Sequence, residues 1–375
     1  MSSNPLSQLS KLGQSFWYDN IQRKMLNNGD LQQMIDEDDL RGITSNPSIF
    51  EKAIANSSDY DSSLTEFVNN ENKGDARAAF FHLAIEDIQQ AADMLRPVYD
   101  ASNGVDGYVS LEVSPDIAND TQASIKEAQD LFLRVDRPNA MIKIPATKEG
   151  IPVIEQLIAD GINVNATLLF SADRYVEVAK AYIRGLSARH QRGLPINNIA
   201  SVASFFISRV DSILDKALDD HHQETNHLKG KMGIANAKVS FIEYLKLFES
   251  DEFKQLEAAG AHPQRLLWAS TGVKNPDYSD VLYIDSLIGN NTVNTIPPAT
   301  ADAFRDHGTV AETLTQNLDE AKAEFAELQN LGIDVAALMD KLEVDGVAIF
   351  AQSFENLLKA IEDKMQNLSS NRGAA

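Results

Sequence analysis

Short apolar runs alternate along the chain with longer amphipathic stretches rich in alanine, glutamate and lysine. This alternation is typical of β/α units with parallel strands. The apolar or β-branched runs are Ser15 to Asp19, Leu40 to Thr44, Gly107 to Val113, Ala140 to Ile144, Ile162 to Leu168, Ile199 to Ser204, Arg265 to Ser270 and Thr292 to Ile296. The helical patterns between them include Ala76 to Leu95, Gln122 to Arg134, Lys148 to Ala159, Ala172 to Ser187 and Ser208 to Leu218. Eight strands predict an α/β fold, a (β/α)8 TIM barrel with additional helices, and an open doubly wound sheet is the alternative.

Two connections between the predicted strands are long. Residues 46–106, rich in asparagine, aspartate and alanine, predict two or three helices after the second strand. Residues 208–264 predict a helical excursion after the sixth strand. No repeat or low-complexity linker divides the chain. We therefore expect residues 1–375 to form a single barrel domain that carries these two helical insertions.

The chain beyond the last predicted strand is helical by pattern. Everything past Pro297 and Pro298 fits this pattern, which gives a helical C-terminal region at about 300–368. A break is expected at Gln329-Asn-Leu-Gly332, where glycine ends a periodic stretch. The segment from Ser369 to Ala375 reads as a frayed tail.

Composition narrows the possible partners. The chain is 43% hydrophobic with a mean hydropathy of -0.26, as expected of a globular protein with a large core. Lys plus Arg is 33 against 55 Asp plus Glu, a net charge of -22 that repels nucleic acid and anionic membranes, so neither is expected as a partner. An anionic substrate must therefore meet a few local cations.

Two further absences bear on location and chemistry. There is no cysteine, which excludes disulfides, thiolate metal sites and thiol catalysis. The N-terminus lacks a basic segment followed by an apolar stretch, and no uninterrupted apolar run approaches the ~18 residues of a membrane span. A cytoplasmic enzyme is the default expectation.

Lys143 stands in the middle of an apolar run that reads as a buried strand. An unpaired lysine is costly in a protein core, so its position needs a reason. The functional interpretation is a desolvated lysine whose neutral amine attacks a carbonyl to form a Schiff base. The structural alternative is an edge-strand lysine that faces solvent and discourages aggregation.

Polar residues gather at the C-terminal ends of the predicted strands, where the active sites of such barrels are built. They are Asp19, Thr44 with Asn46, Glu112, Lys143, Asn165 with Thr167, Ser204 and Ser270. Each has a simpler explanation: Asp19 could be a helix N-cap, Asn46 an ordinary turn residue and Glu112 a solvated strand end. Asn165 and Thr167 alternate with apolar residues, so they share one face of a strand. Together, the whole set favours a catalytic site.

Three of these segments carry a family resemblance. Gly42-Ile-Thr-Ser-Asn-Pro-Ser-Ile-Phe50 resembles the transaldolase signature at the second barrel strand. Met141-Ile-Lys-Ile-Pro-Ala-Thr147 resembles the segment that holds the Schiff-base lysine of that family. Gly161-Ile-Asn-Val-Asn-Ala-Thr-Leu-Leu-Phe-Ser171 matches the fifth strand. The chain is therefore identified as a member of the transaldolase family, of the longer bacterial type, with the resemblance running from about residue 12 to about residue 300.

The resemblance implies catalytic roles for four residues. Lys143 would form the Schiff base, and Asp19 would act as the proton-accepting aspartate. Glu112 and Thr167 would hold a water molecule that relays protons. Neither a metal nor a cofactor is needed for this chemistry.

The resemblance also implies the substrate contacts. Asn46 and Asn165 would bind the hydroxyls of the substrate, and Arg209 its phosphate. The sixth-strand serine of the family falls on Ser204, followed by Phe206. A structural alternative for Arg209 is a solvent-exposed residue in the first turn of a helix.

The seventh strand departs from the better-known family pattern. Many members carry Ser-Phe-Arg there, with the arginine as a second phosphate ligand, whereas this chain reads Ala269-Ser-Thr-Gly-Val-Lys-Asn275. Ser270 is kept, and Lys274 is the obvious cation for the missing arginine. A lysine acts as a point charge and lacks the two-pronged geometry of a guanidinium.

Two further sequence patterns bear on cofactor binding. Asp219-Asp-His-His-Gln-Glu-Thr-Asn-His227 has the residue types of a metal site, but its position between two helical patterns favours a solvated loop. No phosphate-cradling GxxxxGK[ST] or GxGxxG loop occurs, so nucleotide cofactors are not indicated.

The resemblance implies transfer of a dihydroxyacetone unit from sedoheptulose 7-phosphate to glyceraldehyde 3-phosphate, as in the non-oxidative pentose phosphate pathway. The expected partners are these phosphorylated sugars, and the protein would be a monomer or a homodimer. The nearest alternative is a fructose 6-phosphate aldolase, but those relatives are shorter and carry Gln and Tyr in place of Glu112 and Phe206. The alternative from another class is an inactive barrel used as a binding scaffold.

Overall fold

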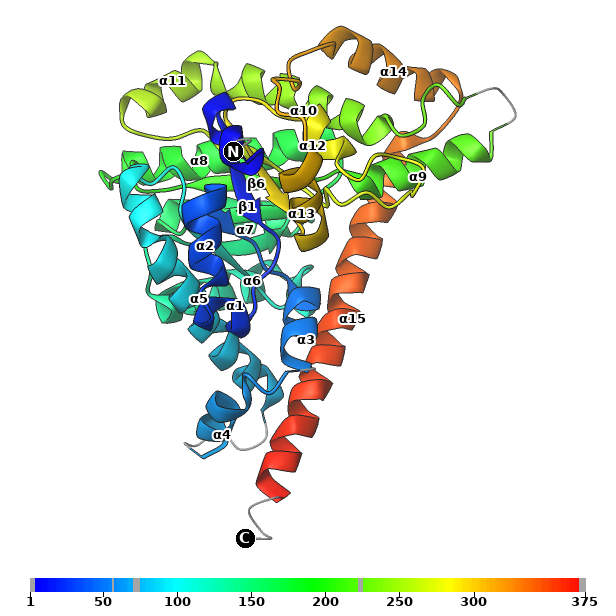
Figure 1. The fold of residues 1–375 in the computed structure, drawn as a ribbon. Coiled ribbons are helices and arrows are strands. Elements are labelled where there is room, and N and C mark those ends of the chain that lie inside the picture. Colours follow the sequence, from blue (N-terminus) through cyan, green and yellow to red (C-terminus); the bar gives the residue numbers. More distant parts are fainter. Residues whose placement is uncertain (1–3, 56, 70–74, 222–224, 371–375) are drawn as a thin grey trace.

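The computed structural model describes residues 4–55, 57–69, 75–221 and 225–370. Its centre is a closed barrel of eight parallel strands, hydrogen-bonded in chain order from β1 beside β2 round to β8 beside β1 (Figure 1). The predicted TIM barrel is confirmed, and the alternative of an open sheet is wrong.

Each predicted run contains one strand, with bounds that differ from the prediction by two residues at most. The strands are β1 (Gln14–Tyr18), β2 (Gly42–Ile43), β3 (Tyr108–Glu112), β4 (Ala140–Pro145), β5 (Val164–Leu169), β6 (Ser201–Phe206), β7 (Arg265–Ala269) and β8 (Thr292–Ile296). The strands are short and almost wholly buried, because each is covered by the barrel interior on one face and by helices on the other.

Side chains alternate along each strand between these two environments. In β4, Ile142 and Ile144 pack in the large apolar core, whereas Met141 belongs to a second cluster and Lys143 lines a cavity. Within the barrel, the strand residues of that second cluster are Trp17, Tyr108, Met141, Val202, Leu267 and Val293. The polar positions near the C-terminal ends of the strands share this interior face, so the alternation directs them into the barrel mouth, whereas a separate polar group at the N-terminal ends includes Ser15 and Arg265.

Helices form the outer layer of the barrel. They include α1 (Arg23–Asn27), α2 (Asp30–Asp38), α6 (Thr121–Val135), α7 (Gly150–Asp160), α8 (Ala172–Gln191), α12 (Leu282–Ser286) and α13 (Pro298–His307), after a 3-10 helix at Leu6–Leu12. Local sequence determines their ends. Asp120 and Ser171 accept hydrogen bonds from the first turns of α6 and α8, and α7 stops at Gly161, whose φ of 91° suits glycine.

The two predicted insertions are helical. The first contains α3 (Pro47–Ala55), α4 (Asp61–Asn69) and α5 (Ala76–Ala101), and the second contains α9 (Ser208–Asp219), α10 (Met232–Phe248) and α11 (Asp251–Ala258). Both follow strands at the C-terminal end of the barrel. They therefore add structure around the same end at which the polar strand-end residues collect.

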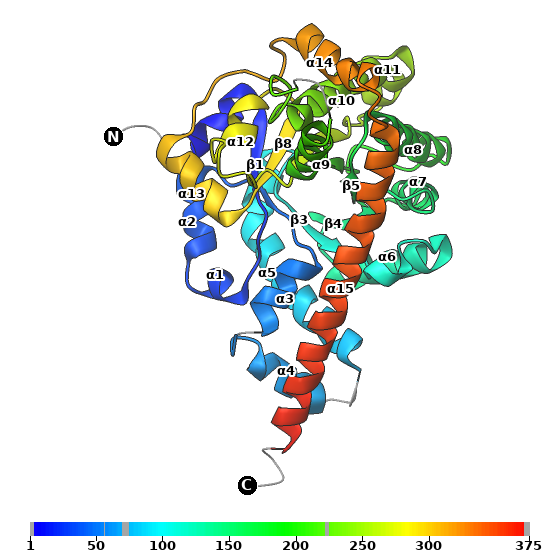
Figure 2. The same cartoon turned by 90° about the vertical axis from the view of Figure 1, so that its right-hand side faces the viewer.

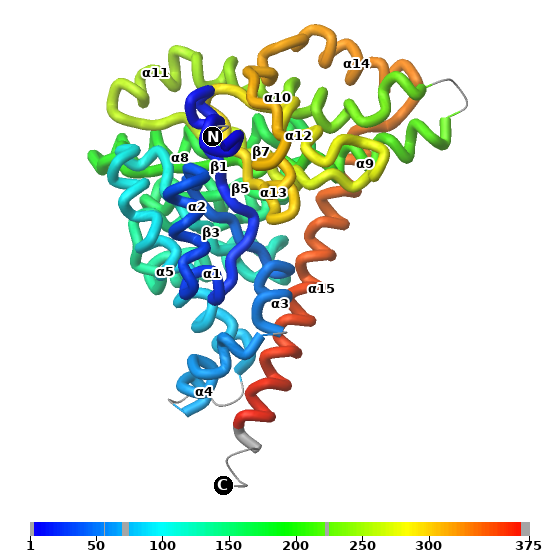
Figure 3. The backbone as a smooth tube through the Cα atoms, in the orientation of Figure 1, coloured from blue at the N-terminus to red at the C-terminus, as the bar shows by residue number. Residues whose placement is uncertain are grey.

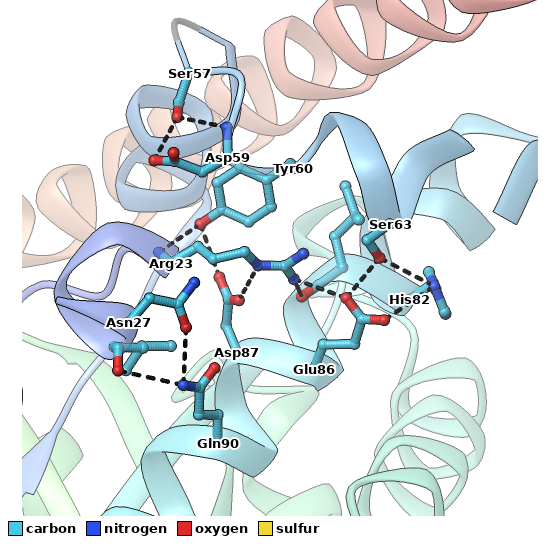
Figure 4. Close-up of polar contacts among 12 residues, drawn as sticks. Arg23, Asn27, Ser57, Asp59, Tyr60, Ser63, His82, Glu86, Asp87 and Gln90 are labelled. Carbon is cyan, nitrogen blue, oxygen red and sulfur yellow. Dashed lines mark hydrogen bonds and ion pairs between the residues drawn. The ribbon is translucent and has the colours of Figure 1, made fainter. Parts of the chain in front are cut away.

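A polar cluster ties α1 to the first insertion (Figure 4). The Arg23 guanidinium donates hydrogen bonds to Asp87 Oδ1 and Glu86 Oε2, each at 2.8 Å. Tyr60 donates its hydroxyl hydrogen to the other Asp87 oxygen at 2.7 Å and accepts from the Arg23 backbone N–H at 3.1 Å. These bonds hold the start of α1, and so limit the movement of the loop that leads from β1 into the barrel mouth.

The C-terminal region is only partly as predicted. The expected break falls between α14 (Leu318–Asn330) and α15 (Val335–Ser370), but residues 308–317 are not helical. The backbone N–H groups of Thr313 and Leu314 both donate to Ile288 O at 2.9 Å, so they are unavailable to a helix. The predicted tail falls on the end of α15 and on residues 371–375, which lie outside the described residues.

The last helix crosses the open end of the barrel. Figure 2 shows α15 running in front of β4 and β5, and Figure 3 traces it from α14 past α3. A hydrogen bond of 2.7 Å joins Ser353 of α15 to Ser48 of α3. One apolar core runs from Leu6 to Met365 and so includes barrel, insertions and α15. No described helix is long and apolar enough to cross a membrane.

Candidate active site

A cavity of about 420 Å³ opens at the C-terminal ends of the strands. Nine residues predicted from sequence line it: Asp19, Thr44, Asn46, Lys143, Ser204, Phe206, Arg209, Ser270 and Lys274. The remaining three, Glu112, Asn165 and Thr167, are buried in the strands beside Lys143 and do not line the cavity. The predicted set is thus brought together, in two layers.

Lys143 lies at the base of this cavity. β4 is paired on both edges, with β3 and β5, and the lysine is only 4% exposed, so the edge-strand interpretation is wrong. Its Nζ donates to the carbonyl of Ser45 at 3.1 Å and lies 3.4 Å from Glu112 Oε2. The amine therefore sits between a carboxylate and the open cavity.

Glu112 is the neighbour of Lys143 in the β3–β4 register. It is 5% exposed, which rules out a solvated strand end. Neither carboxylate oxygen has a hydrogen-bond partner among the described residues. Desolvation raises the pKa of Glu112, although the nearby Lys143 opposes that shift. A buried carboxylate in this state is costly, and such groups are concentrated at functional sites.

Asp19 follows directly after β1, and its backbone N–H donates to the carbonyl of Ile296 in the adjacent strand. The helix α1 begins at Arg23 with Gln22 as its N-cap, so the N-cap interpretation of Asp19 is wrong. Burial raises the pKa of Asp19, while the positive charge of Lys143 and a hydrogen bond from Thr44 lower it. That bond runs from Thr44 Oγ1 to Asp19 Oδ1 at 2.7 Å.

Thr295 is a residue that the sequence analysis missed. Its hydroxyl lies 2.6 Å from that of Thr44. Thr44 has one hydroxyl hydrogen, which it gives to the carboxylate of Asp19, so Thr295 is the donor to Thr44. Thr295 is the polar residue just before the end of the eighth predicted run, so the rule that selected the other strand ends could have found it.

Asn165 and Ser204 are joined inside the barrel. Ser204 Oγ donates to Asn165 Oδ1 at 2.7 Å, and Asn165 Nδ2 donates to Ser110 Oγ at 3.1 Å. Ser110 was not predicted, because it lies in the middle of its run and not at the end. The chain of bonds fixes the amide of Asn165 beside Lys143, its partner in the β4–β5 register.

The strand β5 is distorted just after Thr167. The register with β6 shifts between Ala166 and Leu169, and Leu168 has a φ of 59°, which is rare for a non-glycine residue. Thr167 Oγ1 is buried without a hydrogen-bond partner among the described residues. Bulges and backbone strain of this kind occur at active sites, where they redirect side chains.

Asn46 begins the first insertion. Its Oδ1 accepts from the Ile49 backbone N–H at 3.0 Å, as a helix cap does, so the turn interpretation is correct in part. Asn46 also lines the cavity. Both roles are compatible, because the side-chain nitrogen is not used by the cap.

The opposite wall of the cavity carries cations. Arg209 Nη1 is buried and has no hydrogen-bond partner in the described part of the chain, so the interpretation as a solvent-exposed residue is wrong. Desolvation lowers the pKa of Arg209. Ser270 has a φ of 55°, and its hydroxyl lies 2.8 Å from that of Ser208. Lys274 lines the same wall and is exposed.

Two more lining residues were missed by the sequence analysis, Lys52 of α3 and Phe350 of α15. Among the lining residues, four are cations, namely Lys52, Lys143, Arg209 and Lys274, against one acid, Asp19. On a chain of net charge -22, this local excess of positive charge favours an anionic substrate. Residues 222–224 of the His-rich segment 219–227 lie outside the described residues, and the described remainder is not part of the cavity lining. No described group of three or more His, Cys, Asp or Glu side chains could hold a metal ion.

A parallel barrel with a buried lysine, flanking carboxylates and a cationic wall defines an enzyme of the Schiff-base aldolase class. The family model described as Transaldolase/Fructose-6-phosphate aldolase matches residues 16–361. "Transaldolase 2" of Nostoc punctiforme is 46% identical over 98% of this chain and 100% of that protein. "Transaldolase" of Thiobacillus denitrificans is 46% identical over 96% and 99%, and that of Mycobacterium bovis 44% over 96% and 96%. The chain belongs to the transaldolase family, as its motifs predicted.

Proposed function

We propose that this enzyme moves a dihydroxyacetone unit from sedoheptulose 7-phosphate to glyceraldehyde 3-phosphate, giving erythrose 4-phosphate and fructose 6-phosphate. The observation that carries the proposal is the position of Lys143, which is buried beside Glu112 at 3.4 Å and still lines the cavity. The family and the full-length relatives named transaldolase support the same activity.

The first step is attack of the Lys143 amine on the C2 ketone of the donor sugar. Loss of water from the resulting carbinolamine gives an iminium ion. Glu112 and Thr167 both have buried polar atoms without hydrogen-bond partners among the described residues, as expected of groups that hold an ordered water. We assign to them the water that moves protons during formation and collapse of the carbinolamine.

We assign to Asp19 the role of the base that accepts the proton of the C4 hydroxyl. When the carboxylate takes this proton, the C3–C4 bond breaks and its electrons move to the iminium, leaving an enamine on Lys143 and releasing erythrose 4-phosphate. Attack of the enamine on the aldehyde of glyceraldehyde 3-phosphate reverses these steps, and the new alkoxide takes the proton back from Asp19. Hydrolysis of the iminium then frees fructose 6-phosphate.

Substrate contacts are assigned to the remaining residues. Asn46, Asn165 and Ser204 would bind hydroxyls of the three-carbon unit near Lys143. Arg209, with Ser270 and Lys274, would bind the distal phosphate. Binding energy from that remote group orients the reacting carbons and so contributes to the rate.

Borohydride trapping tests this proposal. Reduction in the presence of fructose 6-phosphate should add a three-carbon unit to the protein, and peptide mapping should place it on Lys143. An unmodified lysine would exclude Schiff-base catalysis and support the scaffold alternative. Assays with and without erythrose 4-phosphate then separate transfer from cleavage, because an aldolase releases free dihydroxyacetone without an acceptor.

A further inference from the structure

The C-terminal helix contributes one side chain to the active-site cavity. Among the described residues of α15, only Phe350 lines it, and its side chain is 4% exposed, whereas the adjacent Ile349 is 49% exposed. The Phe350 ring centre lies 5.8 Å from Lys143 Nζ and 5.7 Å from the Cζ of Arg209. The ring therefore lies near two of the cations that the proposed reaction uses, Lys143 and Arg209.

The helix is fastened where it crosses the cavity. Ser353 is hydrogen-bonded to Ser48, and Glu343 pairs with Arg174 at 3.2 Å. Gly346 allows a close approach, since a Cβ at this position would lie 3.0 Å from a methyl group of Leu168. Phe350 is thus held in place by contacts on both sides of it along α15.

Arg209 lies between two aromatic rings. Its Cζ is 5.1 Å from the ring centre of Phe206 and 5.7 Å from that of Phe350. Both distances are within the range of cation–π attraction. Arg209 makes no ion pair with any described residue, and its Nη1 is buried without a partner. The described interactions that orient the guanidinium therefore include these two rings, together with the electrostatic attraction of Glu112 and Asp19.

We propose that Phe350 is a positioning residue, which acts through Arg209 and holds its guanidinium ready for the substrate phosphate. The inference rests on the proposed function, since it takes Arg209 as a phosphate ligand. An arginine that is already oriented loses less conformational freedom when it binds. A weakened ring contact should therefore raise KM for phosphorylated sugars more than it lowers kcat.

A double-mutant cycle tests this inference. Phe350→Leu keeps an apolar side chain of similar size but removes the π system, and should raise KM for fructose 6-phosphate about 3- to 20-fold. Arg209→Met should raise it further. In the Arg209→Met background, Phe350→Leu should add little, because the group it positions is gone. Phe350→Tyr keeps the ring and should retain most of the affinity.

Two controls separate this effect from loss of packing. Phe354 lies one turn further along α15, with its ring centre 5.4 Å from that of Phe80, so Phe354→Leu should alter the unfolding midpoint and leave KM unchanged. For fructose, which has no phosphate, Phe350→Leu should leave KM close to the wild-type value.

The outcomes distinguish the two proposals. An unchanged KM in Arg209→Met would remove Arg209 from the phosphate site, and with it the proposed binding mode. A normal Arg209 effect with equal factors for Phe350→Leu in both backgrounds would overturn the inference on Phe350 alone. Equal KM changes in Phe350→Leu and Phe354→Leu would assign α15 a packing role only.

Discussion

The two ends of the barrel interior use similar residues to opposite effect. At the N-terminal end, which we call the barrel floor, Asp106 accepts hydrogen bonds from Arg265, Ser15 and Trp17 at 2.8, 2.8 and 3.3 Å. At the mouth, Glu112 forms an ion pair with Lys143 at 3.4 Å, with the charge of Arg209 acting from further away, and has no hydrogen-bond partner among the described residues. Both carboxylates are buried beside a basic side chain.

Their pKa values shift in opposite directions. At the floor, the charge and hydrogen bonds of Arg265, with Ser15 and Arg41, outweigh desolvation, and the pKa of Asp106 falls below its usual value. At the mouth, desolvation outweighs Lys143, and the pKa of Glu112 rises. The Asp106–Arg265 pair, whose carboxylate is fully hydrogen-bonded, supports the fold. The Glu112–Lys143 pair, whose carboxylate lacks hydrogen bonds within the described part of the chain, keeps a group that can exchange protons. Burial of a carboxylate beside a cation thus contributes to stability at the floor and to reactivity at the mouth.

The largest effect is expected at the mouth from Lys143→Met. The variant keeps the length and loses the nucleophile, so transfer should fall by at least about 10⁴-fold. Folding should persist, because desolvation already raises the pKa of Glu112, so this carboxylate can take up a proton when its partner Lys143 is lost. The matched control is Lys148→Met, an exposed lysine five positions along the chain, which should retain activity. Undiminished transfer by Lys143→Met would refute the mechanism.

A matched pair of substitutions tests the comparison directly. Asp106→Asn at the floor leaves the buried Arg265 without its closest charge and should cost about 3–5 kcal/mol in the free energy of unfolding, with kcat changed less than about twofold. Glu112→Gln at the mouth should lower kcat about 100-fold and leave the fold intact. Urea unfolding and steady-state kinetics on both variants provide the measurements. The contrast would be wrong if the two variants lost stability and activity to the same extent.

The contrast also separates what the sequence could predict from what it could not. Alternation places Lys143 and Asn165 inside and Ile142 outside, so the barrel and its strand-end residues follow from local pattern. Phe350 and Phe354 both lie on the apolar stripe of one helix, and only the path of α15 across the mouth decides which ring reaches Lys143. The bulge beside Leu168 likewise depends on how β5 fits its neighbours. Tertiary packing determines these features, and the hydrophobic periodicity of the sequence does not report it.

A smaller effect is expected from Lys274→Ala. This lysine is an exposed point charge on the cavity wall, so its loss should raise KM for phosphorylated substrates about 5- to 10-fold and change kcat less than about twofold. Lys52→Ala is the informative comparison, because Lys52 is a second exposed cation on the same cavity. Unchanged kinetics in Lys274→Ala, with a raised KM in Lys52→Ala, would transfer the role to Lys52.

The smallest effect concerns Asp19 and its pH dependence. Asp19 must be ionised to accept a proton, so kcat/KM should rise as pH rises through its pKa. Because burial raises the pKa of Asp19, this acid limb should lie above the ordinary carboxyl value of about 4. The pKa of Asp106 is lowered, so its contribution to stability is lost only as pH falls below about 4. As pH is lowered, kcat/KM should therefore fall before the contribution of Asp106 to folding stability is lost.

Thr295→Val tests the chain of hydrogen bonds that ends at Asp19 and should therefore influence the acid limb of the pH profile. Thr295 donates to Thr44, which donates to Asp19, and each bond in such a chain strengthens the next. Valine keeps the shape but cannot donate, so the pKa of Asp19 should rise further and the acid limb should move to higher pH. We expect a loss of up to about threefold on the acid limb that largely disappears at higher pH, where Asp19 is ionised in both proteins. Thr295→Ser should restore the wild-type profile, since it keeps the donor. A loss that is the same at every pH, or one that serine does not repair, would mean that Thr295 only fills space between β8 and β2.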